Sequence, residues 1–159
     1  MPAQASIGLR VAGRFTVESS AGSGGMGDVF RARDDQTGQV VALKLLQPDG
    51  GAQDAERFAL EAQILAELQH PGIVAYLAHG EADGGRPYIA MEWLEGEDLS
   101  RRLARGPMPI EEALRLLRRA AEALAAAHAR GVIHRDLKPS NIFLRGGRVD
   151  DLTVLDFGI

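Results

Sequence analysis

The 159-residue sequence lacks cysteine, an excess of basic side chains and long apolar runs. Without cysteine it can form neither a disulfide nor a thiolate metal site, and it has no cysteine nucleophile, which suits a reducing compartment. Its 18 basic and 22 acidic residues give a net charge of −4, whereas a nucleic-acid binder needs a basic surface to neutralise phosphates. We therefore expect a cytoplasmic protein that has no nucleic-acid partner.

The apolar stretches are too short to cross a membrane. The most apolar helical stretch, residues 120–129, is interrupted by Glu122 and His128, and a membrane span needs about 18 or more apolar residues. Residues 1–13 contain no apolar segment of the kind found in a secretory signal. We expect no membrane segment within this chain, and an anchor beyond the given sequence stays open.

Apolar periodicity predicts a first part rich in strands. Alternation and turn residues indicate three antiparallel strands at 15–18, 29–33 and 39–46. A helix is predicted from about Asp54 to His70, because Phe58, Glu61, Leu65 and Leu68 recur at helical spacing and Pro71 cannot extend the helix. Two further strands are expected at 73–77 and 87–91.

The second part is predicted to be mainly helical, and the composition changes at Glu95–Gly96. A short helix is expected at 98–105, and a long one at 110–130 with acidic residues in its first turn and Gly131 after its end. The stripe predicted to be buried on the long helix consists of Ile110, Leu114, Leu117, Ala121, Leu124 and His128.

The segment from Gly22 to Val29 reads Gly-Ser-Gly-Gly-Met-Gly-Asp-Val. Taken alone, these glycines are compatible with a flexible turn, and a dinucleotide-binding fold also uses Gly-x-Gly-x-x-Gly. In the dinucleotide fold the glycines open a helix, whereas here a predicted strand follows them. A glycine hairpin can approach a triphosphate closely and donate backbone N–H groups to it, because no Cβ blocks the approach.

The strand segment Val41-Ala42-Leu43-Lys44 contains a lysine within an apolar run. Alternation places Ala42 and Lys44 on the same face. The ordinary interpretation is an edge lysine whose ammonium reaches water. The functional alternative is a phosphate-binding cation, oriented by Glu61 from the apolar face of the predicted helix.

Two polar motifs follow near the end of the sequence. His134-Arg135-Asp136-Leu137-Lys138-Pro139-Ser140-Asn141 places acidic, basic and amide side chains in one short segment, which is also compatible with a charged surface loop. Asp156-Phe157-Gly158 places a carboxylate at the end of an apolar run. Carboxylate and amide oxygens suit a hard cation such as Mg²⁺.

These four motifs in this order resemble the signature set of Hanks-type Ser/Thr protein kinases, especially the bacterial ones. The resemblance extends from about Arg14 to Ile159. It implies an α+β, two-lobed protein-kinase-like fold, with a complete β-rich N-lobe that carries one long helix and the first part of a helical C-lobe. The implied boundaries are an N-terminal extension at 1–13, the N-lobe and hinge at 14–94, and part of the C-lobe at 95–159.

The resemblance also implies a role for individual residues, with ATP, Mg²⁺ and protein Ser/Thr hydroxyls as partners. The glycine segment would cover the ATP phosphates through Gly22, Ser23, Gly24, Gly25, Met26 and Gly27. The adenosine would be bound by Val29, Ala42, the gatekeeper Met91, backbone groups of Glu92 and Leu94, and Asp98 at the ribose. Lys44 would contact the α- and β-phosphates and pair with Glu61.

In the same pattern, Asp136 would accept the proton of the substrate hydroxyl and Lys138 would neutralise charge on the γ-phosphate. Asn141 and Asp156 would bind Mg²⁺. A lysine two positions after the catalytic aspartate is typical of Ser/Thr rather than tyrosine kinases. His134, Phe157 and Leu65 resemble members of the stacked hydrophobic spine.

The sequence ends one residue after the Asp-Phe-Gly motif, so the activation segment and the later helices of the family are not in it. We interpret the chain as a truncated front part of a kinase domain whose intact parent is active, and whether the truncated chain is itself active stays open. In it the long helix would bury only part of its apolar surface. Two alternatives stay open: a non-catalytic module that binds ATP or a partner, and a dinucleotide-dependent oxidoreductase.

Overall fold

The computed structural model describes residues 7–24, 27–46, 59–60 and 62–157. The chain divides into two compact units. The first consists of residues 1–63 and 76–93, and the second of residues 64–75 and 94–159. Among the described residues, no helix has the length and apolar character that a bilayer crossing requires.

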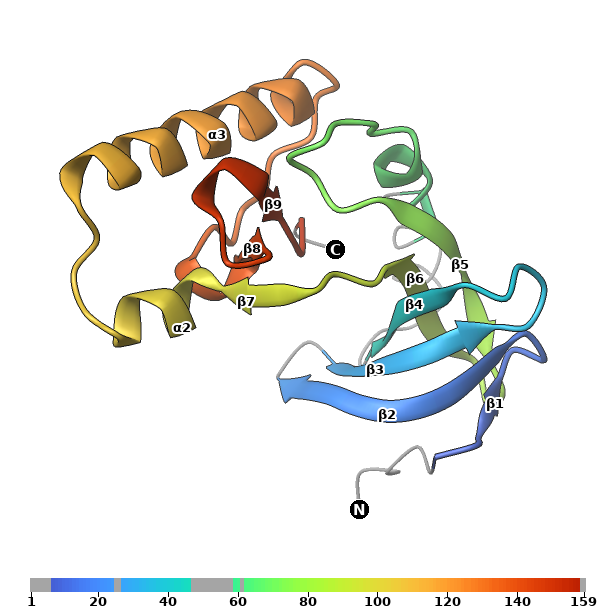
Figure 1. Ribbon diagram of the computed structural model, residues 1–159. Coiled ribbons are helices and arrows are strands. Elements are labelled where there is room, and N and C mark those ends of the chain that lie inside the picture. Colours follow the sequence, from blue (N-terminus) through green and yellow to red (C-terminus); the bar gives the residue numbers. More distant parts are fainter. Residues whose placement is uncertain (1–6, 25–26, 47–58, 61, 158–159) are drawn as a thin grey trace. The chain divides into compact units, whose positions relative to one another are not determined.

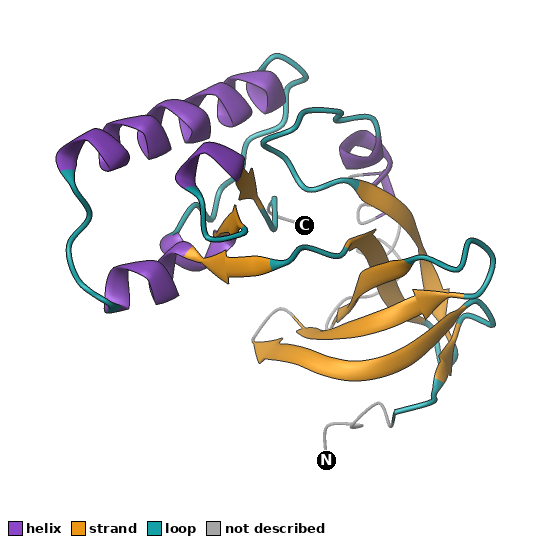
Figure 2. Ribbon diagram, viewed as in Figure 1, coloured by secondary structure: helices purple, strands orange, loops and turns teal. Residues whose placement is uncertain are grey.

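The first unit is built on a six-stranded sheet in the order β1-β2-β3-β4-β6-β5, in which every neighbouring pair is antiparallel (Figures 1 and 2). The strands predicted around the glycine segment and Lys44 are present, as is the strand predicted at 87–91. Their bounds are β1 Arg10–Val11, β2 Phe15–Gly24, β3 Gly27–Asp34, β4 Val40–Leu46, β5 Tyr76–Ala82 and β6 Arg86–Glu92.

Strand alternation builds the core of this unit on one face of the sheet. Val41, Leu43 and Leu45 of β4 are buried in one cluster with Phe15, Phe30 and Tyr88, among others. The Phe15 and Tyr88 rings meet edge to face at a centroid separation of 5.4 Å, an arrangement that adds to the hydrophobic burial. Ala42 and Lys44 therefore lie on the opposite face, as alternation predicted.

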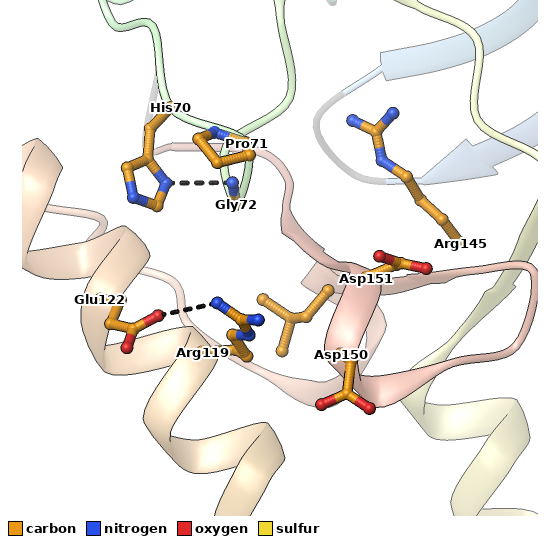
Figure 3. Close-up of a pocket in the computed structure, with 9 residues that line it drawn as sticks. His70, Pro71, Gly72, Arg119, Glu122, Arg145, Asp150 and Asp151 are labelled. Atoms are coloured by element: carbon orange, nitrogen blue, oxygen red, sulfur yellow. Dashed lines mark hydrogen bonds and ion pairs between the residues drawn. The ribbon is translucent and has the colours of Figure 1, made fainter.

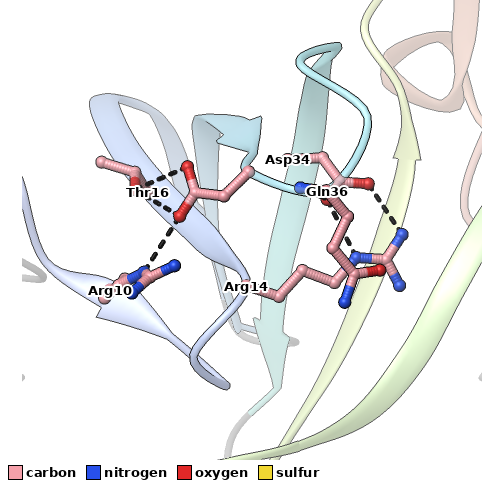
Figure 4. A network of polar contacts seen from close by, with 6 residues as sticks. Arg10, Arg14, Thr16, Asp34 and Gln36 are labelled. Carbon is pink, nitrogen blue, oxygen red and sulfur yellow. Dashed lines mark hydrogen bonds and ion pairs between the residues drawn. The ribbon is translucent and has the colours of Figure 1, made fainter.

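An ionic network stabilises the start of the sheet (Figure 4). Arg14 donates from Nε and Nη2 to the two carboxylate oxygens of Asp34, at 2.9 and 2.7 Å. The guanidinium of Arg14 is the main reason why the pKa of Asp34 is lowered to about 2. Close by, Asp35 accepts from Arg10 and from Thr16, so two carboxylates fix β1 and β2 against the end of β3.

The predicted helix after residue 54 is helical at 59–60 and 62–66. Leu65 and Leu68 are buried, as their spacing predicted. Phe58 and Glu61, which completed the predicted apolar face, lie outside the described residues. The segment ends before His70, whose Nδ1 accepts a hydrogen bond from the Gly72 amide at 3.0 Å.

The second unit combines two helices with a three-stranded sheet in the order β7-β8-β9. Its helix α3 packs against β9 and η2. The elements are β7 Gly96–Asp98, α2 Leu99–Ala104, α3 Ile110–His128, η1 Pro139–Asn141, β8 Ile142–Arg145, η2 Val149–Asp151 and β9 Leu152–Val154.

The stripe predicted to be buried on α3 is wrong. Leu116, Ala120, Ala123 and Ala127 form the buried face, whereas the side chains of Ile110, Leu114 and Leu117 are 79%, 62% and 62% exposed. Ala121 and His128 are also exposed, and Leu124 is half-buried. The helix is apolar on two sides, and the side of small residues is buried because the loop before Ile73 approaches it closely. A Cβ on Gly72 would lie 2.9 Å from the Ala123 Cβ.

The strand predicted at 73–77 is displaced in the structure. β5 begins at Tyr76, and Ile73 instead forms an isolated parallel bridge with Val154. The Val74 amide donates to the Val154 carbonyl at 3.1 Å, and the Val154 amide donates to the Gly72 carbonyl at 2.8 Å. The apolar run at 73–74 is thus buried against β9 of the second unit rather than extending the six-stranded sheet.

Candidate active site

In the first unit, the ladder register groups four of the predicted site residues on one face of the sheet. Val29 on β3 lies opposite Lys44 on β4, and Ala42 on β4 lies opposite Met91 on β6. Residues paired across a ladder share a face, and Ala42 and Lys44 are two positions apart on β4. This face is opposite the one that carries the hydrophobic core.

The described glycines of the glycine segment lie at the end of β2 and at the start of β3. Gly22 pairs with Val29 and Gly24 pairs with Gly27. Gly27 has a φ of +136°, and a Cβ there would lie 2.2 Å from the Leu45 carbonyl oxygen, so the protein's own backbone requires a glycine at this position. A Cβ on Gly22 would meet no described atom within 4 Å. Gly25 and Met26 lie outside the described residues.

Lys44 lies near the centre of the sheet, and only 7% of the residue is exposed. Its neighbours in the ladder are Val29 and Ile89. A buried ammonium is stable only when polar groups compensate for its loss of water. Glu61, the partner that the sequence predicted, lies outside the described residues, so that pairing stays a prediction.

The residues predicted to contact the rest of the nucleoside belong to both units. Glu92 is the last residue of β6, opposite Val41. In the second unit Leu94 is half-buried, and Asp98 is the N-cap of α2, where its Oδ1 accepts from the Arg101 amide at 3.0 Å. Asp98 thus already has a structural role, and its predicted contact with a ribose stays a prediction.

In the second unit, His134 organises the polar loop before η1. Its Nδ1 accepts a hydrogen bond from the Asp136 amide at 3.2 Å, and its Nε2 lies 2.7 Å from the Leu155 carbonyl oxygen. These partners require the proton on Nε2, which then donates to Leu155. The His134 ring also contacts Phe157 at a centroid separation of 4.7 Å. One buried side chain therefore joins the 134–141 loop to the segment after β9.

Asp136, Lys138 and Asn141 come together in this loop. Lys138 Nζ lies 2.9 Å from Asp136 Oδ2. Asn141 Nδ2 donates to the Asp136 backbone carbonyl at 2.9 Å and to its Oδ2 at 3.3 Å. The pKa of Asp136 is lowered, first because Lys138 donates to its carboxylate and also because Asn141 does. The carboxylate is therefore ionised at neutral pH and able to accept a further hydrogen bond.

The end of β9 lies beside Asn141, because the Leu155 amide donates to the Asn141 carbonyl at 2.8 Å. Asp156 follows with a φ of +50°, and Arg135 has a φ of +67°. Non-glycine residues seldom adopt this left-handed conformation, and they often do so where a side chain must be aimed. Since Asn141 Nδ2 is bonded to Asp136, its Oδ1 is the atom left to bind a cation. The oxygens of Asn141 and Asp156 suit a hard cation.

A separate pocket of about 290 Å³ lies between α3, η2 and the 70–72 loop (Figure 3). Its lining combines charged side chains, including Arg119, Glu122 and Asp150, with apolar groups such as Leu152. The described residues that line it include none of the predicted site residues. This pocket is therefore distinct from the group of Asp136, Lys138 and Asn141 described above.

Sequence reasoning missed two polar residues beside the glycine segment. Asp28 and Arg86 form an ion pair at 2.8 Å, with side chains that are 14% and 20% exposed. Neither residue belongs to a spacing pattern, because a pair formed across a sheet depends on register. The available sequence signal for this ion pair was Asp28, a charged residue directly after the glycines.

Comparison with known proteins identifies the family of the chain. The model of the protein kinase domain family matches residues 15–159. The Ser/Thr-protein kinase pkn2 of Myxococcus xanthus is 46% identical over 150 residues, an alignment that covers 92% of this chain and 18% of the relative. PrkC of Bacillus subtilis is 40% identical over 157 residues, with 96% and 24% covered. The chain thus spans less than a third of either relative.

Solved kinase structures share the fold. The Mycobacterium tuberculosis PknI kinase domain superposes with a TM-score of 0.85 at 34% sequence identity. The alignment covers 97% of this chain and 61% of the PknI chain. This level of identity, together with the family match, supports a common architecture and a common family.

Proposed function

The chain belongs to the protein kinase family, and from that premise we propose that it is the nucleotide-binding and catalytic-loop part of a Ser/Thr protein kinase. The proposed reaction transfers the γ-phosphate of ATP to a Ser or Thr hydroxyl of an acceptor protein, in the cytoplasm. The observation that carries the proposal is the cluster of Asp136, Lys138 and Asn141, in which Lys138 lies 2.9 Å from the carboxylate.

The proposed chemistry assigns the proton to Asp136. The acceptor hydroxyl oxygen forms a bond to the γ-phosphorus, the bond from that phosphorus to the β–γ bridging oxygen breaks, and ADP leaves. The hydroxyl proton passes to the Asp136 carboxylate, while Lys138 offsets charge on the transferred group. Such transfer depends mainly on positioning and on charge neutralisation, and both suit a loop fixed by hydrogen bonds.

The nucleotide is assigned to the sheet face that carries Val29, Ala42 and Lys44. Gly22 supports this assignment. Neither a positive φ nor packing within the described residues requires a glycine there, and without a Cβ the backbone leaves room for a close approach by a ligand. Lys44 would place a fixed positive charge near the phosphates.

Mg²⁺ is the cofactor proposed for this reaction. Asn141 Oδ1 and the Asp156 carboxylate would bind it, and their oxygens match its preference for hard ligands. When bound, it neutralises phosphate charge as that charge shifts toward the leaving group. Two protein ligands would leave room for phosphate oxygens and for water molecules, several of which Mg²⁺ usually keeps.

The proposal is tested by incubating the protein with Mg²⁺, γ-labelled ATP and general acceptor proteins. We expect label on serine or threonine, and we expect Asp136→Asn to lower the rate by about 10²- to 10⁴-fold, the usual contribution of a positioned proton acceptor. Asp150→Asn is the matched control, because that aspartate lines the separate pocket, and it should leave transfer unchanged.

Two other results would change the assignment. If the wild-type chain binds MgATP but transfers nothing, even to itself, it acts as a non-catalytic nucleotide-binding module. If nicotinamide dinucleotides bind in place of ATP, the oxidoreductase alternative replaces the kinase proposal.

A further inference from the structure

A polar cluster that includes one residue of the glycine segment joins three strands of the sheet. Its members are Ser23 on β2, Asp28 on β3 and Arg86 on β6, and we refer to them as the Asp28 cluster. Ser23 Oγ donates to Asp28 Oδ1 at 2.8 Å. Arg86 Nη2 donates to Asp28 Oδ2, also at 2.8 Å. Both carboxylate oxygens are thus bonded, each to a different strand.

Arg86 also bonds the strand that carries Lys44. Its Nε donates to the Leu46 carbonyl at 2.9 Å, and its Nη2 reaches the Leu45 carbonyl at 3.3 Å. β4 lies between β3 and β6 in the sheet, so the guanidinium crosses the end of β4 to reach Asp28. One side chain therefore ties the first residues after the glycines to the residues directly after Lys44.

The Asp28 cluster lies on the sheet face opposite Lys44. Asp28 pairs with Leu45 in the ladder, whereas the next residue, Val29, pairs with Lys44. Leu45 belongs to the hydrophobic core cluster, and adjacent residues of a strand point to opposite faces. The cluster can therefore affect a nucleotide on the Lys44 face only by positioning the hairpin.

The strand β2 bends before it reaches the glycines, so its position there depends on other contacts. The register of β2 against β3 shifts between Val17 and Ser19 and again between Ser20 and Gly22, and such bulges bend a strand. β1 pairs with β2 at Phe15 and Thr16, far from the glycines. Beyond these bends, Ser23 on β2 and Arg86 on β6 are both bonded to Asp28 on β3. The pKa of the Asp28 carboxylate is lowered, chiefly because Arg86 donates to it.

We propose that Asp28, Arg86 and Ser23 are positioning residues that fix the glycine segment relative to Lys44 and thereby set the affinity for nucleotide phosphates. This inference rests on the proposed function, because it needs a nucleotide on the Lys44 face. Its strength comes from charge-assisted hydrogen bonds between side chains that are 14% and 20% exposed, which solvent and salt screen less than a surface pair.

The test compares Arg86→Gln and Asp28→Asn with wild-type protein in calorimetric titrations with MgATP and with adenosine. We expect each variant to bind MgATP roughly three- to tenfold more weakly, the loss of one partly shielded charge-assisted contact. Adenosine has no phosphates, so its affinity should not change. The losses in the double variant should be less than additive, because each substitution removes the ion pair between Asp28 and Arg86. Arg10→Gln, which removes an ion pair with Asp35, is the matched control and should affect neither ligand.

The possible outcomes separate the cluster from the proposed function. Equal losses for MgATP and adenosine would mean that the cluster only stabilises the sheet, which overturns the inference, as would unchanged MgATP binding. If wild-type protein binds neither ligand, the proposed function fails and the inference fails with it. Hydrogen exchange gives an independent check without nucleotide: the amides of Gly22 and Gly27 should exchange faster in Arg86→Gln than in Arg10→Gln, and equal rates would contradict the role of the cluster.

Discussion

The two units of this chain position their candidate site side chains by different physical means. In the six-stranded sheet, a regular ladder places Val29, Ala42 and Lys44 on one face, and each position follows from strand register. In the second unit, Asp136 and Asn141 lie on a loop whose shape depends on side-chain hydrogen bonds and on positive φ angles. The candidate face of the sheet therefore follows from alternation, whereas the shape of the loop depends on individual polar contacts.

The largest effect expected in the sheet is that of Lys44→Met on phosphate transfer. The substitution removes the fixed charge assigned to the phosphates and keeps a long apolar side chain at a buried position, so the fold should persist. We expect a rate lower by roughly 10²- to 10³-fold, in the range for one preorganised electrostatic contact. Arg33→Met, a change to a half-exposed cation on β3, is the control. Equal rates for Lys44→Met and wild type would remove Lys44 from the mechanism.

Gly27→Ala and Gly22→Ala should separate packing from ligand approach within the same hairpin. At Gly27 the new Cβ would lie 2.2 Å from the Leu45 carbonyl oxygen, so we expect the free energy of unfolding to fall by about 2–4 kcal/mol. At Gly22 the Cβ has open space, so unfolding should change by less than about 1 kcal/mol while MgATP binding weakens. Urea unfolding measures the first effect and nucleotide titration the second. Similar unfolding curves for the two variants would contradict this distinction.

Arg14→Gln tests the ionic network at the start of the sheet. The pKa of Asp34 is lowered to about 2 in the folded protein, from about 3.9 in an unfolded chain. The ion pair therefore contributes stability that is fully present above about pH 4 and is lost as pH falls through about 2. We expect Arg14→Gln to cost about 2 kcal/mol at pH 7 and the difference from wild type to shrink on acidification. A cost independent of pH from 7 to 2 would show that packing, not charge, explains it.

A smaller effect is expected in the loop of the second unit, in the pH dependence of Lys138→Gln. Lys138 is the main cause of the lowered pKa of Asp136, so without it this pKa should rise toward its ordinary value. Activity falls on the acid side when Asp136 becomes protonated, so the acid limb of kcat/KM should move to higher pH. Profiles measured for wild type and for Arg130→Gln, a control on the exposed turn after α3, complete the comparison. If the acid limb of kcat/KM lies at the same pH in Lys138→Gln and in wild type, Lys138 does not set the pKa of Asp136.

The sequence predicted most of what depends on periodicity. The strands around Lys44, its position opposite the core face and the bounds of α2 and α3 followed from alternation, helical spacing and capping residues. The buried face of α3 did not, because Leu114 and Leu117 are as apolar as Leu116, and only the close approach of Gly72 to Ala123 selects the side of small residues.

The polar contacts of the candidate site were predicted less completely. The sequence motifs identified the loop at 134–141. No pattern in the sequence shows that His134 bonds the Leu155 carbonyl or that Arg86 crosses β4 to reach Asp28. Such contacts join segments that are distant in sequence, and each depends on one side-chain conformation. They are therefore properties of the folded chain rather than of any local pattern.

Transfer of the γ-phosphate, followed by mass spectrometry of the acceptor proteins, tests the kinase assignment most directly. With wild-type protein and MgATP we predict phosphoserine or phosphothreonine on the acceptors or on the chain itself, and with Asp136→Asn we predict almost none under the same conditions. Equal phosphorylation by both proteins would contradict the role of Asp136, and its absence from both, with MgATP bound, would contradict catalysis by this chain.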